Sequence, residues 1–269
     1  MLSQPSTLAV FAHPDDESFS CGGTLARLAA GGGQVSLICA TSGEVGEISD
    51  AVLATPENLG EVRREELRAA ARLLGAREPY FMGYRDSGMA GTPANQDPRS
   101  LVRTPVDVVG GKVLEFIRRL KPELVITFDA GGVYGHPDHI AIHQATGWAL
   151  QVLARDADAR LPSLYYTALP RGHLSRLMEE ARQRGIPPPQ GSGINLETLG
   201  TPDELVTTVV DVGAYVDAKL GAIRSHRTQI NPNNPLLRLP EDLVRRFLEK
   251  EHFTLAPQGA PLDCLARLP

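Results

Sequence analysis

Two short stretches of this sequence place histidines and carboxylates directly after apolar runs. The first is residues 13–17 (HPDDE), which follow the apolar run 8–12. Because Pro14 keeps His13 out of the helical region, a turn can bring the imidazole of His13 close to the carboxylate of Asp16. An imidazole and a carboxylate are two of the three protein ligands typical of a catalytic zinc site, whose fourth position is open to water. The third ligand must come from elsewhere in the chain.

The second stretch supplies further candidate ligands. It reads FDAGGVYGHPDHIAIH (residues 128–143) and follows the apolar run 124–128, so a glycine-rich loop leads into an expected helix. His139 and His143 are one helical turn apart, whereas His136 lies nearer the loop. Spacing alone does not choose among the three histidines.

Each stretch by itself also fits the start of a helix. Capping and the helix dipole favour acidic side chains there, which would explain residues 15–18 and Asp138 without a metal. Two histidine-rich stretches at the ends of expected strands are better explained by a site, because ligands of open α/β sheets bind beyond the carboxyl ends of the strands. We therefore expect both stretches to meet in one metal site.

A sheet must position these stretches. Apolar runs of strand length alternate with segments of helical period, which predicts an α/β fold with a mostly parallel sheet flanked by helices. The expected strands are 8–12, 35–41, 79–83, 124–129, 163–169 and 207–212. The expected helices cover 23–32, 59–75, 107–120, 139–154 and 214–226.

The length suits one domain, and we expect residues 1–269 to form it. From residue 185 the pattern loosens into GIPPPQGSGINLETLGTPDE (185–204), after which a strand and two helical segments are expected. We interpret residues 185–269 as a subregion that walls the cleft and carries the C-terminal elements, rather than as a linker and second domain.

Composition narrows the partners and the location. A net charge of −5, from 27 basic and 32 acidic residues, gives no basic surface for nucleic acid. Three widely spaced cysteines favour reduced thiols over disulfides. Without a basic leader or a segment approaching the ~20 apolar residues that span a bilayer, we expect a cytoplasmic protein with no membrane contact. The sequence leaves homo-oligomerisation open.

Several motifs together resemble one family. AHPDDE (12–17) followed by GHPDH (135–139) is similar to the signature pair of the PIG-L/LmbE zinc-dependent N-deacetylases, which remove acyl groups from N-acetylglucosamine conjugates. Further similar segments occur in the family's order, so the resemblance covers most of the chain: TSGEVGE, RREELRAAARLLG, GYRDSGMAG and KLGAIRSHRTQ. The branch that it resembles most acts on thiol-cofactor precursors and conjugates, namely the mycothiol-type deacetylase and amidase, with bacillithiol-type enzymes nearby.

The resemblance implies a Rossmann-like sheet and a set of site roles. It implies one Zn²⁺ per chain held by His13, Asp16 and His139, with Fe²⁺ or another divalent ion as the alternative. It assigns Asp15 as general base and His136 as the group that stabilises the oxyanion or protonates the leaving amine. We expect Asp138 to orient the ring of His136 or of His139. No GxGxxG follows the first expected strand, so a nucleotide cofactor is not expected.

Substrate contacts are expected from loops at the same edge of the sheet. Competing roles are a solvated helix face for Arg63, a turn cap for Ser87 and a helix cap or surface position for His226. His143 is expected to pack behind the site. The candidate substrate-binding residues are Glu47, Arg63, Asp86, Ser87, Met89, Tyr134 and His226.

The function expected from these motifs is zinc-dependent removal of acetyl from an N-acetylglucosamine-linked small molecule, such as GlcNAc-malate or GlcNAc-inositol. A mycothiol-type S-conjugate amidase is the alternative within the family. A magnesium-dependent phosphoryl-transfer enzyme would use the acids but leave His136 and His139 idle, because Mg²⁺ prefers oxygen ligands. A non-catalytic sugar-binding protein on the same fold is the alternative of another class.

Overall fold

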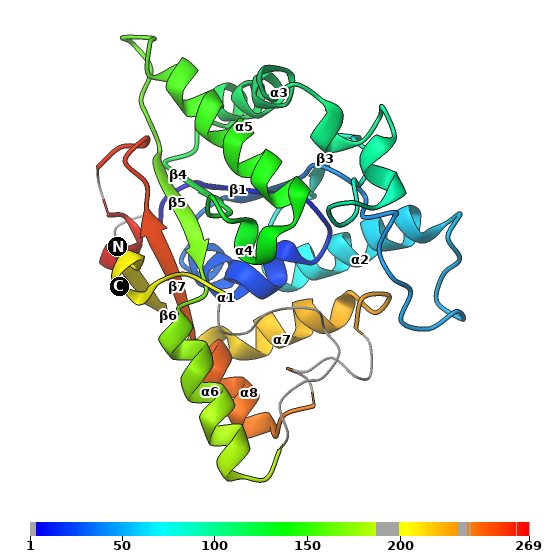
Figure 1. Ribbon diagram of the computed structural model, residues 1–269. Coiled ribbons are helices and arrows are strands. Elements are labelled where there is room, and N and C mark those ends of the chain that lie inside the picture. The colour runs from blue at the N-terminus through cyan, green and yellow to red at the C-terminus, as the bar shows by residue number, and fades with distance from the viewer. Residues whose placement is uncertain (1–3, 187–198, 231–235, 237, 262, 269) are drawn as a thin grey trace.

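The computed structural model describes residues 4–186, 199–230, 236, 238–261 and 263–268, which form a mixed α/β fold around one sheet (Figure 1). The strand order is β3-β2-β1-β4-β5-β7-β6. All pairs from β3 to β5 are parallel, and β7 is antiparallel to both β5 and β6. The strands are β1 (Thr7–Phe11), β2 (Val35–Cys39), β3 (Tyr80–Phe81), β4 (Leu124–Thr127), β5 (Ser163–Ala168), β6 (Thr208–Asp211) and β7 (Lys250–Leu255).

Helices cover both faces of the sheet. The packed pair α3–α5 lies on one side, and α1 and α2 lie with α7 on the other (Figure 1). The helices are α1 (Asp16–Ala30), α2 (Leu59–Leu73), α3 (Val106–Leu120), α4 (Gly132–Gly135), α5 (Pro137–Leu153), α6 (Arg171–Gln183), α7 (Val216–Ser225) and α8 (Glu241–Leu248). None of the described helices is long and apolar enough to cross a bilayer.

The predicted strands and the mostly parallel sheet are confirmed, with one strand missed. β7 was not expected because its sequence, KEHFTL, begins with charged and polar residues rather than an apolar run. Only its alternate positions Glu251 and Phe253 are buried, which is the pattern of a strand with one covered face. Helix α1 also begins earlier than expected, at Asp16 rather than at residue 23. Residues 187–198 of the expected cleft wall lie outside the described residues.

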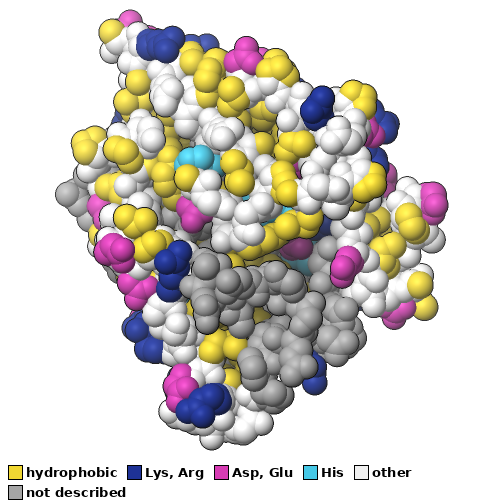
Figure 2. Space-filling view, viewed as in Figure 1, with side chains coloured by type: hydrophobic (Ala, Val, Ile, Leu, Met, Phe, Trp, Pro, Cys, Tyr) yellow, Lys and Arg dark blue, Asp and Glu magenta, His cyan; other side chains and the backbone are white. Residues whose placement is uncertain are grey.

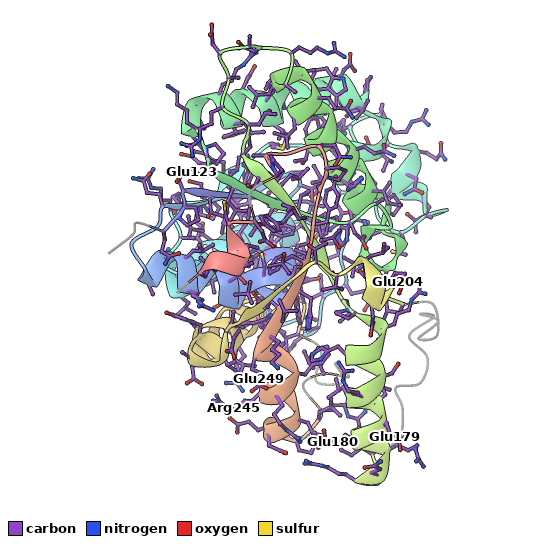
Figure 3. All side chains as sticks on the ribbon, turned by 90° about the vertical axis from the view of Figure 1, so that its left-hand side faces the viewer. Glu123, Glu179, Glu180, Glu204, Arg245 and Glu249 are labelled. Atoms are coloured by element: carbon purple, nitrogen blue, oxygen red, sulfur yellow. The ribbon has the colours of Figure 1, made fainter. Side chains whose placement is uncertain are left out.

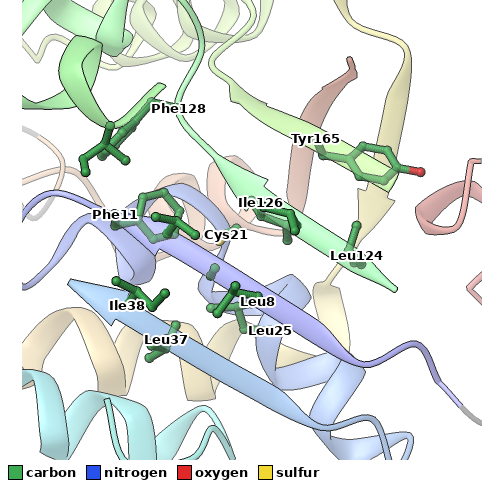
Figure 4. Packing of buried hydrophobic residues seen from close by; sticks show 14 of the residues in the cluster. Leu8, Phe11, Cys21, Leu25, Leu37, Ile38, Leu124, Ile126, Phe128 and Tyr165 are labelled. Atoms are coloured by element: carbon green, nitrogen blue, oxygen red, sulfur yellow. The ribbon is translucent and has the colours of Figure 1, made fainter. Parts of the chain in front are cut away.

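The central strands are buried on both faces, as the continuous apolar runs require. Every residue of β1, β2 and β4 is buried. Leu8, Leu37 and Ile126 from these strands pack together in the core shown in Figure 4. Phe11, the last residue of β1, meets Phe128 beyond β4 with ring centroids 5.0 Å apart. This apolar layer forms a rigid base directly under the carboxyl ends of β1 and β4.

The C-terminal elements form a smaller layer beside the sheet. Helices α6 and α8 pack through Leu177, Ala181 and Leu243. Exposed ion pairs from Arg184 to Asp242 and from Arg246 to Glu180 join the same two helices. Glu180 on α6 lies toward α8 in the side-chain view (Figure 3).

Helix α1 is interrupted at Cys21, whose φ of −148° is not helical. Glu251 of β7 restores the hydrogen bonding there, because its carboxylate accepts from the backbone N–H of Gly23 at 2.9 Å and of Thr24 at 2.7 Å. The ammonium of Lys219 pairs with the same carboxylate, and both side chains are buried. The three cysteines of the chain are free thiols, and Cys21 and Cys39 are buried.

Candidate metal and catalytic site

The two histidine-rich stretches meet at one edge of the sheet. β1 and β4 are parallel neighbours in register from Thr7 opposite Leu124, so their carboxyl ends lie side by side. The strand order reverses here, since β2 and β3 lie beyond β1 on one side and β5 lies beyond β4 on the other. Such a reversal opens a crevice for ligands. The structure therefore brings residues 13–16 and 136–139 together.

His139 directs one bare ring nitrogen into this crevice. Its Nδ1 lies 3.2 Å from the carbonyl oxygen of Gly132, which can only accept, so Nδ1 carries the hydrogen. In the neutral ring the lone pair then lies on Nε2, which is 3.2 Å from Oδ1 of Asp16. Gly132 has a φ of +61° and an added Cβ would lie 3.0 Å from that of His139, so glycine suits this position.

His13 directs its own bare nitrogen at the same point. Its Nε2 lies 3.1 Å from Oδ2 of Asp138 and 3.5 Å from Oδ1 of Asp86, so in the neutral ring Nε2 carries the hydrogen. The remaining nitrogen, Nδ1, is 3.3 Å from Nε2 of His139 and 3.5 Å from Oδ2 of Asp16. Two lone pairs and a carboxylate thus converge, and a cation is what such a set of acceptors requires.

The donor chemistry fits a divalent transition metal. Imidazole nitrogens and a carboxylate oxygen are the ligands of catalytic zinc sites, and His13 and His139 are 6% and 1% exposed. Ring nitrogens of His13, His136 and His139 also lie within 4.8 Å of one another, so distance alone leaves Asp16 and His136 as alternative third ligands. Asp86 and Asp138 form a second such group, on the other side of the His13 ring.

Asp138 does not orient the ring that we expected. Its carboxylate faces His13, and the same oxygen accepts from the backbone N–H of Ser87 at 2.9 Å. Only the backbone N–H of Asp138 reaches His136, donating to Nδ1 at 3.2 Å. The expectation of His136 or His139 as the partner was wrong because Asp138, in the first turn of α5, points back across the sheet edge to the loop after β1. In the neutral ring, Nε2 of His136 is then the hydrogen-bond donor.

Asp15 is the first of the two adjacent acids and has an unusual backbone. It is the N-cap residue of α1, but its side chain makes no capping hydrogen bond, and its φ is +118°. The guanidinium of Arg63 donates to the Asp15 carboxylate at 3.2 Å and to the carbonyl of Pro14 at 2.7 Å. Helix capping, the alternative explanation for residue 15, is therefore not the role of this side chain.

The electrostatics separate the two adjacent acids. Burial raises the pKa of Asp15 to about 6, and the charge of Asp16 adds to this while Arg63 opposes it. For Asp16, burial acts to raise the pKa, but His139 and His13 outweigh it and hold the pKa well below its usual range. Asp16 is therefore the more strongly anionic of the pair, as a metal ligand must be.

The histidine rings also differ in charge. Burial lowers the pKa of His136 to about 4, and the charges of His13 and His139 act in the same direction. Burial acts to lower the pKa of His13 as well, but hydrogen bonds to Asp138, Asp16 and Asp86 outweigh it and raise the pKa well above the usual value. The three carboxylates around the His13 ring thus favour a positive charge at this position.

Two of the expected substrate-binding residues are fully buried and have hydrogen-bond partners within the protein. Ser87 is 0% exposed, and its hydroxyl accepts from the backbone N–H of Val102 at 3.1 Å. His226 is also 0% exposed, and its Nε2 lies 2.9 Å from Oε1 of Glu17. Substrate contact by Ser87 or His226 stays a prediction, because motif position shows that a residue lies near a site but not which way its side chain points.

Arg63 and Asp86 are buried as well, with partners in the protein. The second guanidinium nitrogen of Arg63 donates to the carbonyl of Gly43 at 2.8 Å, and an added Cβ on Gly43 would lie 2.1 Å from it. Asp86 accepts from the backbone N–H of Gly88 at 2.8 Å besides facing His13. Substrate contact by either residue stays a prediction.

Three expected substrate-binding residues are exposed to solvent. Glu47 is exposed, Met89 is 46% exposed and Tyr134 is 45% exposed. The ring of Tyr134 lies over the site, 5.2 Å from the His139 ring centroid. Histidine side chains are visible near the centre of the face in Figure 2, among hydrophobic side chains. His143 packs behind the site as expected, with Nδ1 3.0 Å from the carbonyl of Phe128.

Comparison with known proteins shows the family. The chain matches the family model "PIG-L: GlcNAc-PI de-N-acetylase" over residues 8–150. A 1D-myo-inositol 2-acetamido-2-deoxy-α-D-glucopyranoside deacetylase from Thermomonospora curvata is 39% identical, with 94% of this chain and 91% of the relative covered. The protein of the same name from Thermobispora bispora is 37% identical, covering 100% and 93%. The chain belongs to the PIG-L family.

A solved structure shows the same fold. The N,N'-diacetylchitobiose deacetylase from Pyrococcus horikoshii superposes with a TM-score of 0.63, covering 94% of this chain and 84% of that one. Its sequence identity is 22%, so the likeness is one of architecture. The sheet and its flanking helices are therefore those of the family fold.

Proposed function

We propose that this protein is a zinc-dependent amide hydrolase that removes the acetyl group from an N-acetylglucosamine-linked small molecule. The observation that carries the proposal is the convergence of His13 Nδ1, His139 Nε2 and the Asp16 carboxylate, which in the neutral rings places two imidazole lone pairs beside a carboxylate. Family membership and the names of the relatives support the reaction and favour a GlcNAc-inositol as first substrate to test.

In this proposal His13, Asp16 and His139 hold the metal, with Fe²⁺ or another divalent ion as the alternative to zinc. When bound, such an ion lowers the pKa of a coordinated water and polarises the substrate carbonyl. Asp16 rather than His136 is assigned as third ligand, because its carboxylate approaches both other ligands and His136 already accepts from Asp138 N–H.

The protein's own groups then handle the protons. Asp15 accepts the proton of the attacking water and delivers it to the departing nitrogen, which its raised pKa favours at neutral pH. His136, with Nε2–H free to donate, stabilises the developing oxyanion. Asp138 and Asp86 hold the His13 ring in one tautomer and orientation.

Substrate contacts are proposed for the exposed residues Glu47, Met89 and Tyr134. They are also proposed for buried residues beside the metal site, namely Arg63, Asp86, Ser87 and His226. A cytoplasmic location is proposed on the three free thiols. We also propose that the chain forms one domain, in which residues 185–269 include the wall of the cleft. Its proposed partner is a small-molecule glycoside.

The test is amine release from a panel of substrates by the zinc-loaded protein. The panel is GlcNAc-inositol, GlcNAc-malate, free GlcNAc and a thiol S-conjugate of GlcNAc-type sugar. We expect release from at least one acetylated glycoside and none after metal removal by chelation. Release only from the S-conjugate would replace the deacetylase with the amidase alternative. Sugar binding without release, unchanged by Asp15→Asn, would favour the non-catalytic alternative.

A further inference from the structure

The backbone of Asp15 is held by a buried carboxylate that no proposed step uses. With φ +118° and ψ −27°, Asp15 has a conformation that residues with a Cβ rarely adopt. Such a conformation persists only where its surroundings impose it, and it recurs at functional sites. Here Oε2 of Glu17 accepts from the backbone N–H of Asp15 at 3.1 Å.

Glu17 is in turn held from another part of the chain. It is 2% exposed, and its second oxygen, Oε1, lies 2.9 Å from Nε2 of His226 and also accepts from the hydroxyl of Ser18. His226 follows the last turn of α7 and is 209 positions away in sequence. The contact chain therefore runs from α7 through two buried side chains to the peptide of Asp15.

Arg63 completes the arrangement from the opposite side. Its guanidinium holds the carbonyl of Pro14 and the carboxylate of Asp15. In the peptide that joins Pro14 and Asp15, the oxygen therefore accepts a hydrogen bond from Arg63 and the N–H donates one to Glu17. This double hold fixes the peptide that carries the Asp15 side chain, with Arg63 of α2 on one side and Glu17 in the first turn of α1 on the other.

We propose that Glu17 and His226 are positioning residues for hydrolysis, which hold the Asp15 peptide so that its carboxylate meets the reacting water. This inference rests on the proposed function, and specifically on Asp15 as the base. The role of His226 is to fix the Glu17 carboxylate, because its fully buried ring lies 2.9 Å from that carboxylate.

Another buried glutamate of the same chain provides a matched control. Glu66 of α2 is 8% exposed and accepts from the backbone N–H and the hydroxyl of Thr228, at 2.8 and 2.7 Å. Glu66 therefore anchors the segment that begins with His226 but does not touch Asp15. Glu17→Gln and Glu66→Gln remove the same charge and keep the same size, so they share any general effect on folding.

The first measurement is the kinetic split for both variants. In Glu17→Gln only one side-chain oxygen remains, so Asp15 N–H and His226 no longer each have an acceptor oxygen of their own. We expect kcat to fall about 10- to 100-fold, because a small misplacement of a catalytic group slows the reaction by such factors. KM and zinc content should stay within about twofold, and Glu66→Gln should leave kcat within about twofold. His226→Gln, which can still donate to Glu17, should retain more activity than His226→Leu.

The deciding measurement repeats Glu17→Gln in an Asp15→Asn background. If Glu17 acts through Asp15, the second substitution lowers kcat by less than about twofold there, because the group it positions is already gone. Three results would overturn the inference: equal losses of kcat in both backgrounds, loss of zinc from Glu17→Gln, or an unchanged kcat in a folded Glu17→Gln. In each case an active wild-type protein would leave the proposed function standing. If wild-type protein releases amine from no substrate, the function fails and the inference fails with it.

Discussion

Two buried clusters of charged side chains in this protein differ in how completely they are paired. In the Lys219–Glu251 pair, one cation meets one anion, and the remaining carboxylate oxygen accepts from Thr24 N–H. In the metal-site cluster, which comprises His13, Asp16, Asp86, His136, Asp138 and His139, carboxylates and bare ring nitrogens face one another. Oδ1 of Asp138 has no hydrogen-bond partner among the residues that the structure describes.

The difference separates a structural cluster from a functional one. A complete ion pair satisfies itself and needs nothing from outside, whereas a surplus of acceptors is costly to bury unless a cation joins it. Both clusters contact the same helix, α1, which begins at Asp16 in the metal site and donates to Glu251 after its interruption. Substitutions in the metal-site cluster should therefore reduce metal binding, whereas substitutions in the Lys219–Glu251 pair should reduce the stability of the fold.

The largest effect on turnover is expected from His139→Ala. Removing one of three ligands should release the zinc and reduce amine release to background, as metal analysis and the panel assay would show. His143→Ala is the control, since it lies one helical turn further and bonds to a carbonyl behind the site. If His143→Ala lost zinc and His139→Ala kept it, the ligand would be His143 and our assignment of His139 would be wrong.

Asp15→Asn should reduce kcat while keeping the metal. The amide cannot accept the proton of the water, so a loss of about 10²- to 10⁴-fold is expected, the usual contribution of a general base. Zinc content should equal that of the wild type, because Asp15 is not a ligand in our assignment. Loss of zinc together with activity would move Asp15 into the ligand set.

Asp138→Ala should weaken zinc binding without abolishing it. The substitution removes the acceptor that holds His13 Nε2, and loss of such a partner typically costs about 10- to 100-fold in metal affinity. Competition with a chelator of known affinity measures this directly. Unchanged zinc affinity would show that Asp86 alone orients His13, or that the ring needs no such partner.

The smallest effect on turnover is expected from Lys219→Met, which breaks the complete cluster. Because Glu251 would stay buried without its cation, the free energy of unfolding should fall by about 3–5 kcal/mol. Denaturant unfolding measures the loss, and kcat of the folded protein should stay within about twofold. Arg68→Met, at an exposed pair with Glu65 and Glu78, should cost at most about 1 kcal/mol. Equal losses would contradict the comparison.

Much of the fold was predictable because its central strands are short and buried on both faces. A central parallel strand such as β1 is buried at every position and apolar at most of them, so its run is visible in the sequence. β7 was missed because one covered face leaves only Glu251 and Phe253 buried, and one of these is itself charged. A buried charge gives no apolar signal, and its partner Lys219 is 32 positions away.

The candidate site was likewise predictable in part. Local order in HPDDE and GHPDH already specified which residue types follow β1 and β4, and sheet topology required that they meet. Motif position also suggested His226 and Ser87, but not that both are fully buried. Glu17 was visible as part of the acidic run, yet nothing local showed that it bonds to the peptide of Asp15.

The sequence by itself determined the strands from β1 to β6, the two histidine-rich turns and the ligand groups that those turns carry. Only the tertiary structure decided which atoms face which: that Asp138 holds His13 across 125 positions and that His226 holds Glu17 across 209. The physical reason is range. Backbone preferences and apolar periodicity act over a few residues, whereas the direction of a ring nitrogen or a carboxylate is set by packing between segments far apart in the chain.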